Sequence, residues 1–210
     1  MERLRPDQQR AATQTLAEAF ANDPLLEILA PDPARRMKLG PPMMGVLLAY
    51  GMRYGQVWSN DDASAVAIWL HPESGPMKMP RMLRAGMWRA PFMLGLDGMG
   101  RMSKAMSATE GFHKQVEGPH WYLMTVGTRT ARQGQGLGSK LVEMGTSRAD
   151  AAGVPCYLET GTDSNIAFYR KRGFEVVGQA DCYGYTLTGM IRPPRQPAEI
   201  VPQSQAEGPA

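Results

Sequence analysis

The stretch RQGQGLGSK, residues 132–140, has the composition of an anion-binding turn. It places three glycines between Arg132 and Lys140, directly ahead of the apolar-periodic run LVEMGTSRADAAG. Because glycine has no Cβ atom and tolerates positive φ, a ligand can approach the backbone N–H groups of such a turn closely. The first N–H groups of a helix also lack partners within the helix and lie in the positive field of its dipole. The stretch therefore predicts a phosphate-binding turn at the start of a helix.

Two well-known phosphate motifs do not fit this stretch. A Walker loop ends in Gly-Lys-Ser/Thr, whereas the order here is Gly138, Ser139, Lys140, so the lysine comes one place late. A dinucleotide fingerprint requires G-x-G-x-x-G early in a βαβ unit, but this stretch reads G-x-G-x-G and lies about two thirds of the way along the chain. The sequence therefore disfavours a nucleoside triphosphatase and a Rossmann-type oxidoreductase.

The expected phosphate ligands are the backbone groups of the turn and of the first helical residues, namely Gly134, Gly136, Leu137, Gly138 and Ser139. The side chain of Gln133 or Arg132 could add a donor, and Arg129, Lys140 and Lys171 are further candidates for contacting phosphate charge. The alternative is a glycine-rich turn that serves only tight packing between a strand and a helix.

The segments around the turn alternate between strand and helix patterns. Strand HWYLMTV precedes the turn and a helix of roughly four turns follows it. Strand PCYLETG, helix NIAFYRKR and strands FEVVGQA and CYGYTLTGMI then complete the order. This alternation predicts an α/β fold with a mixed sheet that is covered by helices on both faces.

The region ahead of the turn is mostly helical in pattern. A helix is expected over residues 8–20, and the NDP at residues 22–24 ends it. A second helical region, residues 34–55, is expected to be interrupted by Pro41 and Pro42, since proline cannot donate the helical hydrogen bond. Residues 57–70 predict a β-hairpin. Methionine-rich, helix-compatible segments then follow as far as Val116, and 12 of the 16 methionines lie between Met37 and Met106.

Composition limits the class of protein. The 210 residues predict one domain, residues 1–192, followed by a Pro-rich tail, residues 193–210, that is expected to be disordered. The net charge of +3 is scattered, so small anionic ligands are expected rather than nucleic acid. Cys156 and Cys182 do not have metal-ligand spacing, and no apolar run approaches the ~18 residues of a membrane span, so neither a metal nor a membrane partner is expected. We expect a cytoplasmic protein, either a monomer or a homodimer.

The pattern Q-x-x-G-x-G at Gln133, Gly136 and Gly138, with Thr125 and Val126 ahead of it and NIAFYRKRGF after it, resembles the GNAT superfamily of N-acetyltransferases. Within that superfamily, most of the chain is similar to the puromycin N-acetyltransferases and their relatives, through the stretches AFANDP, GQVWSNDDASAVAIWLHPES, HWYLMTVGTRTARQGQGLGS and VPCYLETGTDSNIAFYRKRGF. Between residues 74 and 116 this similarity is weak. The resemblance implies a single-domain GNAT-like fold with a mostly antiparallel sheet and a splayed central strand, acetyl-CoA as cosubstrate and no metal.

The resemblance also assigns roles to individual residues. Val126 and Thr128 occupy the strand whose freed backbone groups would meet the pantetheine arm and the thioester carbonyl, and Asn165 would contact the coenzyme. Tyr169, four residues after Asn165 and so on the same helical face, is the leading proton donor. Thr130 stands where the family frequently has proline, which makes the rigidity of the turn less certain than its location.

Glu159 is the leading base, because apolar strand neighbours would raise the pKa of its carboxyl by desolvation. Each catalytic assignment has a structural alternative. The Tyr169 ring could simply pack under the sheet, as Phe168 and Phe174 would, and Glu159 could form an ion pair with a cation among residues 170–172.

Acetyl transfer to a small-molecule amine, by direct attack in a ternary complex, is the function that these residues favour. A hydrophobic or aromatic amine is expected, because some of the methionine-rich region should line the acceptor pocket. Two alternatives stay open at this point. One is a peptide or protein N-acetyltransferase, and the other is a non-catalytic acyl-CoA-binding module.

Overall fold

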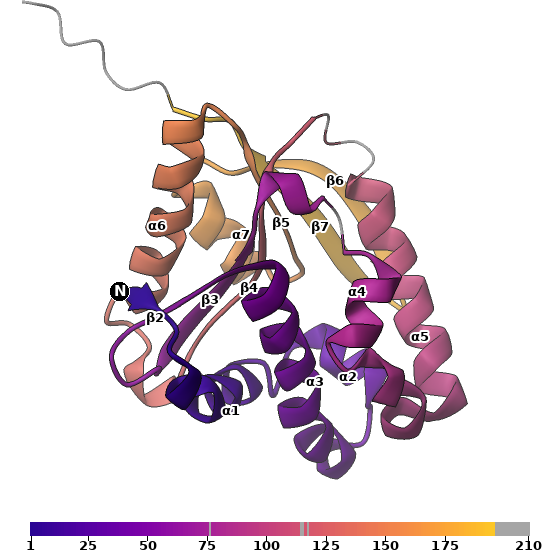
Figure 1. Cartoon of the computed structure of the whole chain (residues 1–210). Helices are drawn as coiled ribbons and strands as arrows, with labels where there is room; N and C mark the ends of the chain where they lie inside the picture. Colours follow the sequence, from indigo (N-terminus) through magenta and orange to yellow (C-terminus); the bar gives the residue numbers. More distant parts are fainter. Residues whose placement is uncertain (76, 114–115, 117, 196–210) are drawn as a thin grey trace, which may run out of the picture.

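The computed structural model describes residues 1–75, 77–113, 116 and 118–195, and in these residues the chain forms one seven-stranded sheet with helices on both faces (Figure 1). The strands, in the order in which they lie side by side, are β1 (Glu2–Arg3), β2 (Gly55–Ser59), β3 (Ala65–Leu70), β4 (Trp121–Thr128), β5 (Cys156–Thr160), β7 (Tyr185–Arg192) and β6 (Glu175–Cys182). All neighbouring strands pair antiparallel except β4 and β5, which pair parallel. The predicted α/β class and the mixed, mostly antiparallel sheet are confirmed.

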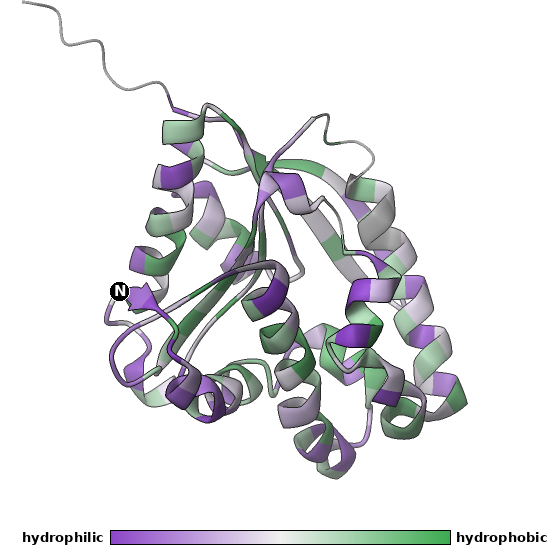
Figure 2. Ribbon diagram, in the orientation of Figure 1, coloured by the Kyte–Doolittle hydropathy of each residue, from purple (hydrophilic) through white to green (hydrophobic). Residues whose placement is uncertain are grey.

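The helices divide between the two faces of the sheet according to the alternation of the strand residues. On β3, Val66 and Ile68 join the hydrophobic cluster under the N-terminal helices, whereas Ala67 and Trp69 join the cluster under the later helices. Five α-helices belong to the first face, namely α1 (Gln9–Ala19), α2 (Pro24–Leu29), α3 (Pro33–Tyr54), α4 (Met79–Arg84) and α5 (Ala90–His113), and two belong to the second, namely α6 (Leu137–Ala152) and α7 (Asp163–Arg170). Figure 2 shows strongly hydrophobic residues on the central strands and mixed colouring on the outer helices.

Strands β4 and β5 diverge along most of their length. They pair only at Trp121 with Cys156 and at Tyr122 with Tyr157, although β4 continues to Thr128. On its other side β4 carries a bulge, because Trp69 faces Leu123 while the adjacent Ile68 faces Thr125, which leaves Met124 as an extra residue. The predicted splayed central strand is confirmed, and the main-chain groups on the β5 side of β4 beyond Tyr122 are not used in a ladder with β5.

One helical prediction was wrong, because Pro41 and Pro42 do not interrupt the second helix. They lie inside α3, which runs without a break from Pro33 to Tyr54. Each proline removes one intrahelical donor, to the carbonyls of Met37 and Lys38 respectively. Both of these acceptor residues are exposed, so water can satisfy their carbonyl groups.

Helix α2 and strand β1 were not predicted. Helix α2 begins directly after Asp23, whose carboxylate accepts a hydrogen bond from Leu25 N at 2.9 Å. The NDP sequence therefore ends α1 and also caps the next helix, a double use that the breaker signal alone does not reveal. Strand β1 has only two residues, which are too few to show a period.

The end of the described chain is tied to α6. Arg192 and Asp150 form a two-pronged ion pair, with N–O distances of 2.7 and 2.8 Å, and Arg195 N donates to Asp150 Oδ1 at 2.7 Å. The first residues of the predicted Pro-rich tail are thus ordered against the domain, whereas residues 196–210 of that tail lie outside the described residues. No helix in the described part of the chain is both long and apolar enough to span a membrane.

Candidate active site

The glycine-rich turn leads from β4 into α6 with the geometry that the sequence predicts. Gly134 and Gly136 have φ values of 75° and 73°, in the left-handed region that favours glycine, and Gly136 directly precedes α6. The first main-chain bond of α6 runs from Lys140 N to Gly136 O at 3.1 Å. A Cβ atom added at Gly134 or Gly136 would meet no other atom within 4 Å, so the space above the turn is open to a ligand.

The first turn of α6 also packs against the end of β4. A Cβ atom at Gly138 would lie 3.6 Å from Thr128 Oγ1, and Gln133 Nε2 donates a hydrogen bond to Thr128 O at 3.2 Å. The Gln133 amide therefore braces the turn. Thr130 N donates to Glu18 Oε1 at 3.0 Å, a bond that proline could not make, which ties this turn to α1. The glycine-rich turn therefore packs against β4 and α1 and also leaves open space for a ligand at Gly134 and Gly136.

The side chain of Arg172, a residue that follows α7, reaches the first turn of α6. The sequence did not predict this contact. The Arg172 guanidinium stands 3.5 Å from the centroid of the Phe168 ring and donates to Ser139 Oγ in the first turn of α6. A planar cation beside unpaired helical N–H groups is suited to a phosphate. The only sequence signal was the position of Arg172 near the end of the helix NIAFYRKR, where it was considered as a partner for Glu159.

Two of the predicted cations already have carboxylate partners. Arg129 Nε lies 3.9 Å from a Glu18 oxygen, and Arg132 Nη1 lies 3.3 Å from an Asp62 oxygen. Lys140 and Lys171 are exposed. Arg172 is thus the one of these cations whose guanidinium contacts the first turn of α6 directly.

Val126 and Thr128 lie on β4 beyond its last pair with β5, which is the location predicted for them. Both are partly buried, and Val126 packs on the face of the sheet that α6 and α7 cover. The structure therefore brings this open edge of β4, the glycine turn and the start of α6 into one continuous region.

Asn165 and Tyr169 lie one turn apart on α7. The Thr162 hydroxyl caps this helix by accepting a hydrogen bond from Asn165 N at 3.3 Å, and the Asn165 side chain is exposed. Tyr169 is buried, and its ring packs edge-on against Phe168 and Phe174 at 5.1 and 5.7 Å between centroids. Burial raises the pKa of the Tyr169 hydroxyl, although the nearby charge of Arg172 opposes this shift, so the hydroxyl keeps its proton at neutral pH.

Glu159 lies on the opposite face of the sheet from Tyr169. The alternation of β5 places Tyr157 and Glu159 together on the face of α1 to α5, where the hydroxyls of Tyr122 and Tyr157 influence the Glu159 carboxyl group. One carboxylate oxygen, Oε1, is fully buried. Burial raises the pKa of Glu159 to about 7, and the nearby hydroxyls of Tyr122 and Tyr157 limit this rise.

The cations considered as alternative partners of Glu159 belong to the other side of the sheet. Helix α7 packs on the second face, and Arg172, just after it, contacts Ser139 and Phe168 there. The hydroxyls of Tyr122 and Tyr157 are part of the environment of Glu159. A buried carboxyl group with a pKa of about 7 can accept a proton at neutral pH.

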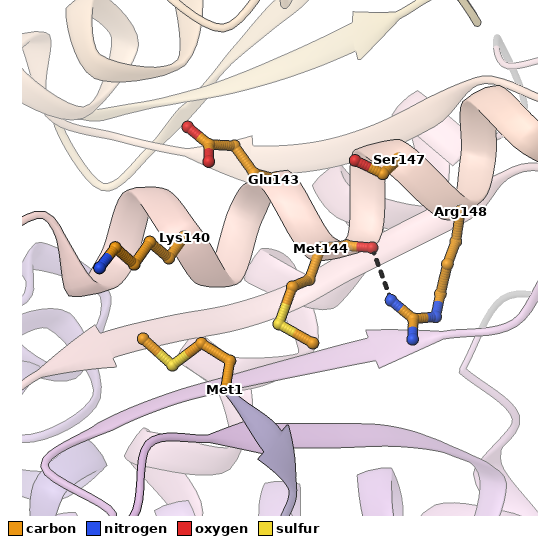
Figure 3. Close-up of a pocket in the computed structure, with 6 residues that line it drawn as sticks. All are labelled: Met1, Lys140, Glu143, Met144, Ser147 and Arg148. Carbon is orange, nitrogen blue, oxygen red and sulfur yellow. Dashed lines mark hydrogen bonds between the residues drawn. The ribbon is translucent and has the colours of Figure 1, made fainter.

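A depression of about 470 Å³ lies on the exposed side of α6 and is lined by Met1, Lys140, Glu143, Met144, Ser147 and Arg148. Figure 3 shows these side chains. Arg148 Nη1 donates to Met144 O at 2.9 Å within the same helix. Neither Tyr169 nor Glu159 lines this depression. In the residues that the structure describes, no group of three or more His, Cys, Asp or Glu side chains could hold a metal ion.

Comparisons with known proteins agree with this arrangement. A sequence model of the acetyltransferase (GNAT) family matches residues 94–174, which include the open edge of β4, the glycine turn and α7. An uncharacterized N-acetyltransferase of Schizosaccharomyces pombe is 27% identical over 172 residues, covering 79% of this chain and 70% of that protein.

Solved structures show the same fold. The histone acetyltransferase HPA2 and related acetyltransferase from Corynebacterium glutamicum has a TM-score of 0.67 and 22% identity, covering 94% of this chain and 97% of that chain. Arylalkylamine N-acetyltransferase 2 from Aedes aegypti has a TM-score of 0.61 and 12% identity, covering 92% of this chain and 98% of that chain. The GNAT-like fold that the resemblance implied is confirmed.

Proposed function

This chain is an N-acetyltransferase with the GNAT fold, and we propose that it transfers the acetyl group of acetyl-CoA to the amine of a small molecule by direct attack in a ternary complex. The single observation that carries the proposal is the open glycine turn at the start of α6, directly beyond the point where β4 leaves β5. Such a turn suits a pyrophosphate, and the open edge of β4 offers main-chain groups to an extended pantetheine arm.

The donor site consists mainly of backbone groups. Gln133 and Gly134 hold the shape of the turn, and the amides from Gly136 to Ser139 face the phosphates. Val126 and Thr128 present main-chain groups on the open edge of β4, and Asn165 contacts the coenzyme from α7. Arg172 supplies a cation beside Ser139. When bound, acetyl-CoA supplies the thioester carbonyl and a thiolate leaving group.

Tyr169 and Glu159 perform the proton transfers from opposite faces of the sheet. The Tyr169 hydroxyl, whose pKa burial raises, carries the proton that the leaving thiolate needs. Glu159 accepts the proton of the amine, directly or through water. Because the pKa of Glu159 is about 7, its basic form increases as the pH rises through 7, and turnover should rise with it.

The proposed acceptor is a hydrophobic or aromatic primary amine. Four methionines of the helical region, Met43, Met44, Met82 and Met102, share one hydrophobic cluster with Tyr122 and Tyr157, which contact Glu159. Methionine adapts its shape to varied apolar ligands, so this cluster favours an apolar acceptor. The cytoplasmic location and the choice between monomer and homodimer stay predictions from the sequence.

Calorimetry with acetyl-CoA tests the donor site. We expect heat of binding and a raised melting temperature with acetyl-CoA, and much smaller effects with NAD or ATP at the same concentration. The absence of both signals at millimolar acetyl-CoA would contradict the assignment.

An acceptor panel tests the substrate. Free thiol release should be fastest with aromatic primary amines. It should be slower both with polyamines such as spermidine and with peptide N-terminal amines. Highest turnover with a peptide would favour the peptide N-acetyltransferase instead.

A further inference from the structure

Large apolar side chains are exposed where α4 meets the start of α5. The 3₁₀ helix Met87–Arg89 lies between these two helices and contacts both. The exposed side chains on the three elements, which we call the apolar corner, are Met79, Leu83, Trp88, Phe92 and Leu96. Figure 2 shows strongly hydrophobic residues at the start of α5, at the edge of the molecule. Apolar side chains gathered on one surface indicate a binding surface, whereas scattered ones do not.

Helical geometry holds these side chains outward. Met79 and Leu83 stand four residues apart on α4. Trp88 and Phe92 have the same spacing across the junction into α5, where the backbone of Ala90 is helical. Because residues at this spacing lie on one side of a helix, each pair projects in one direction, while Ala90 is buried between α5 and the core.

A break in α5 places Leu96 outside this register. Gly95 has a φ of 69°, in the left-handed region that favours glycine. Arg35 of α3 holds the chain just before the break, because its Nη2 atom donates to Leu94 O at 2.8 Å and to Met93 O at 3.3 Å. The exposed Arg35 guanidinium thus adds a positive charge to this end of α5.

Further cations border the apolar corner. Residues 74–96, which lie between two acidic residues in the sequence, contain one lysine and three arginines but no aspartate or glutamate. Of these cations, Lys78, Arg84 and Arg89 are exposed. The exposed Arg53 of α3 reaches the same place, because its Nη1 atom donates to Arg84 O at 3.3 Å. In the part of the chain that the structure describes, none of these four exposed cations forms an ion pair with a carboxylate, so their charge is left for a partner to neutralise.

The charge and the shape of the apolar corner favour one class of partner. A second copy of the chain, in a symmetric dimer, would place these cations against one another, and like charges repel. A rigid protein partner would need a separate hollow for each protruding side chain, and Phe92 and Leu96 keep 86% and 90% of their full accessible area. A bilayer deforms around such side chains, and the headgroups of anionic phospholipids attract lysine and arginine.

We propose that the apolar corner and its bordering cations dock on the surface of a bilayer that contains anionic phospholipids. The apolar side chains enter the boundary between headgroups and acyl chains, and the cations meet the headgroup phosphates. Trp88 suits this boundary, since tryptophan combines an apolar ring with one polar N–H group. Such a contact needs no membrane-spanning run, the absence of which led the sequence to predict no membrane partner. The inference is independent of the proposed acetyl transfer.

Flotation of the full chain with lipid vesicles tests this contact. The parent should float with vesicles of phosphatidylcholine and phosphatidylglycerol in equal parts and bind vesicles of phosphatidylcholine alone at least about tenfold more weakly. High salt should remove most of this difference, because it screens the headgroup charge. Failure to bind the mixed vesicles at low salt would overturn the proposal, and so would equal binding to both kinds of vesicle.

Tryptophan fluorescence locates the contact on the molecule. Trp88 is 55% exposed, whereas Trp69 and Trp121 are buried and Trp58 is half-buried. Brominated acyl chains should therefore quench the fluorescence of the bound parent. They should quench Trp88→Phe much less, although this variant still floats because phenylalanine is also apolar. Equal quenching of the two proteins would place the contact elsewhere and overturn the proposal.

An apolar variant and its control test the insertion. Phe92→Ala should weaken binding to the mixed vesicles roughly tenfold or more, because a ring that would leave water is lost. Tyr183→Ala removes a ring that is 50% exposed in the turn between β6 and β7, and it should bind like the parent. Equal binding by Phe92→Ala and the parent would overturn the proposal. If light scattering shows a dimer of the parent that Phe92→Ala abolishes, while neither protein binds vesicles, the surface is an interface between copies and the proposal fails.

Charge reversal tests the cations. The double variant Arg84→Glu, Arg89→Glu should weaken binding to the mixed vesicles roughly tenfold or more. The double variant Arg10→Glu, Arg170→Glu changes the net charge equally at exposed positions of α1 and α7, and its effect should be much smaller. Equal losses in the two double variants would show attraction by net charge alone and would overturn docking through the apolar corner.

Discussion

The segment from β4 to α7, residues 121–170, and the helical region from α3 to α5, residues 33–113, build their parts of the site in different ways. In the first segment the essential features are backbone features, namely a strand that leaves its neighbour, a turn with two glycines at positive φ and the start of a helix. In the second region any contact with an acceptor depends on side chains from three separate helices. Backbone features follow from local sequence, whereas a pocket made by several helices follows from their packing.

The two regions also differ on their surfaces. The helical region leaves Trp88, Phe92 and Leu96 exposed, at 55%, 86% and 90% of their full accessible area, and α5 is broken at Gly95, where φ is 69°. The segment from β4 to α7 has no residue among the large exposed hydrophobics of the described chain. The GNAT family model, which spans residues 94–174, covers all of β4 to α7 but only the end of the helical region. The comparisons therefore support the acetyltransferase reaction more than they support any particular acceptor.

The largest expected effect on turnover comes from removing the Tyr169 hydroxyl, which lies on α7. Tyr169→Phe removes the hydroxyl and keeps the ring contacts with Phe168 and Phe174. Turnover should fall ~100- to 10,000-fold, as for loss of a general acid, while acetyl-CoA affinity stays near that of the parent, because the lost interaction forms only in the transition state. Single-turnover kinetics at saturating acetyl-CoA measure the chemical step. Equal rates for variant and parent would remove Tyr169 from the mechanism and favour a water as the proton donor.

The second prediction tests whether the glycine turn acts through its backbone. Gly136→Glu places a side chain and a negative charge in the open space at the start of α6, so acetyl-CoA affinity should fall by roughly 100-fold or more. Gly153→Glu is the matched control, since Gly153 ends the same helix with a φ of 65° and equally open space. Both variants should lose a similar stability, about 1–2 kcal/mol, from the unfavourable φ. Calorimetry that finds equal affinity in the two variants would place the phosphates elsewhere.

Features that depend on local sequence were predicted, and features that depend on packing between distant elements were not. The glycine turn and the helix that carries Tyr169 were predicted from short patterns whose conformation depends on their own residues, whereas the splayed strand was implied by the resemblance to the GNAT superfamily. The continuity of α3 through Pro41 and Pro42 could not be predicted, since it depends on which side of the helix faces solvent. The contact of Arg172 with Ser139 and the influence of Tyr122 on Glu159 join residues that are distant in sequence, so no local pattern records them.

The third prediction concerns Glu159, on the face of the sheet that the helical region covers. Its pKa is raised from 4.5 to about 7 in the folded chain, so between these values the native state binds more protons than the unfolded state. The free energy of unfolding should therefore fall as the pH rises from about 4.5 to 7, by about 3 kcal/mol at most, and stay lower above pH 7.

Glu159→Gln removes this titration. Its free energy of unfolding should vary less over the same pH range and exceed that of the parent above pH 7, as measured by urea denaturation at several pH values. Turnover should fall by about tenfold near pH 7 and by less at higher pH, where solvent supplies more free amine. A variant that is less stable than the parent at pH 8 would show that burial does not penalise the Glu159 charge.

The smallest expected effect concerns the donor site and Arg172, whose guanidinium contacts the first turn of α6. Arg172→Ala should weaken acetyl-CoA binding by about tenfold, because one charge-assisted contact to phosphate is lost. Arg172→Lys should keep part of the affinity, since it retains the charge without the planar group that stacks on Phe168. Arg170→Ala, at the exposed last residue of α7, is the matched control and should bind acetyl-CoA like the parent.

Salt dependence separates a phosphate contact from a structural one. If Arg172 meets phosphate charge, the difference in affinity between the parent and Arg172→Ala should shrink as the salt concentration rises, because screening weakens the parent's contact and leaves the variant less affected. If Arg172 only anchors the end of α7 to Ser139, the difference should persist at high salt and be accompanied by a lower melting temperature without ligand. Calorimetry at 0.05 and about 0.5 M salt, where the screening length falls from above ~10 Å to a few Å, distinguishes the two results. A difference that persists would remove Arg172 from the phosphate site and leave the backbone groups of the glycine turn as its main ligands.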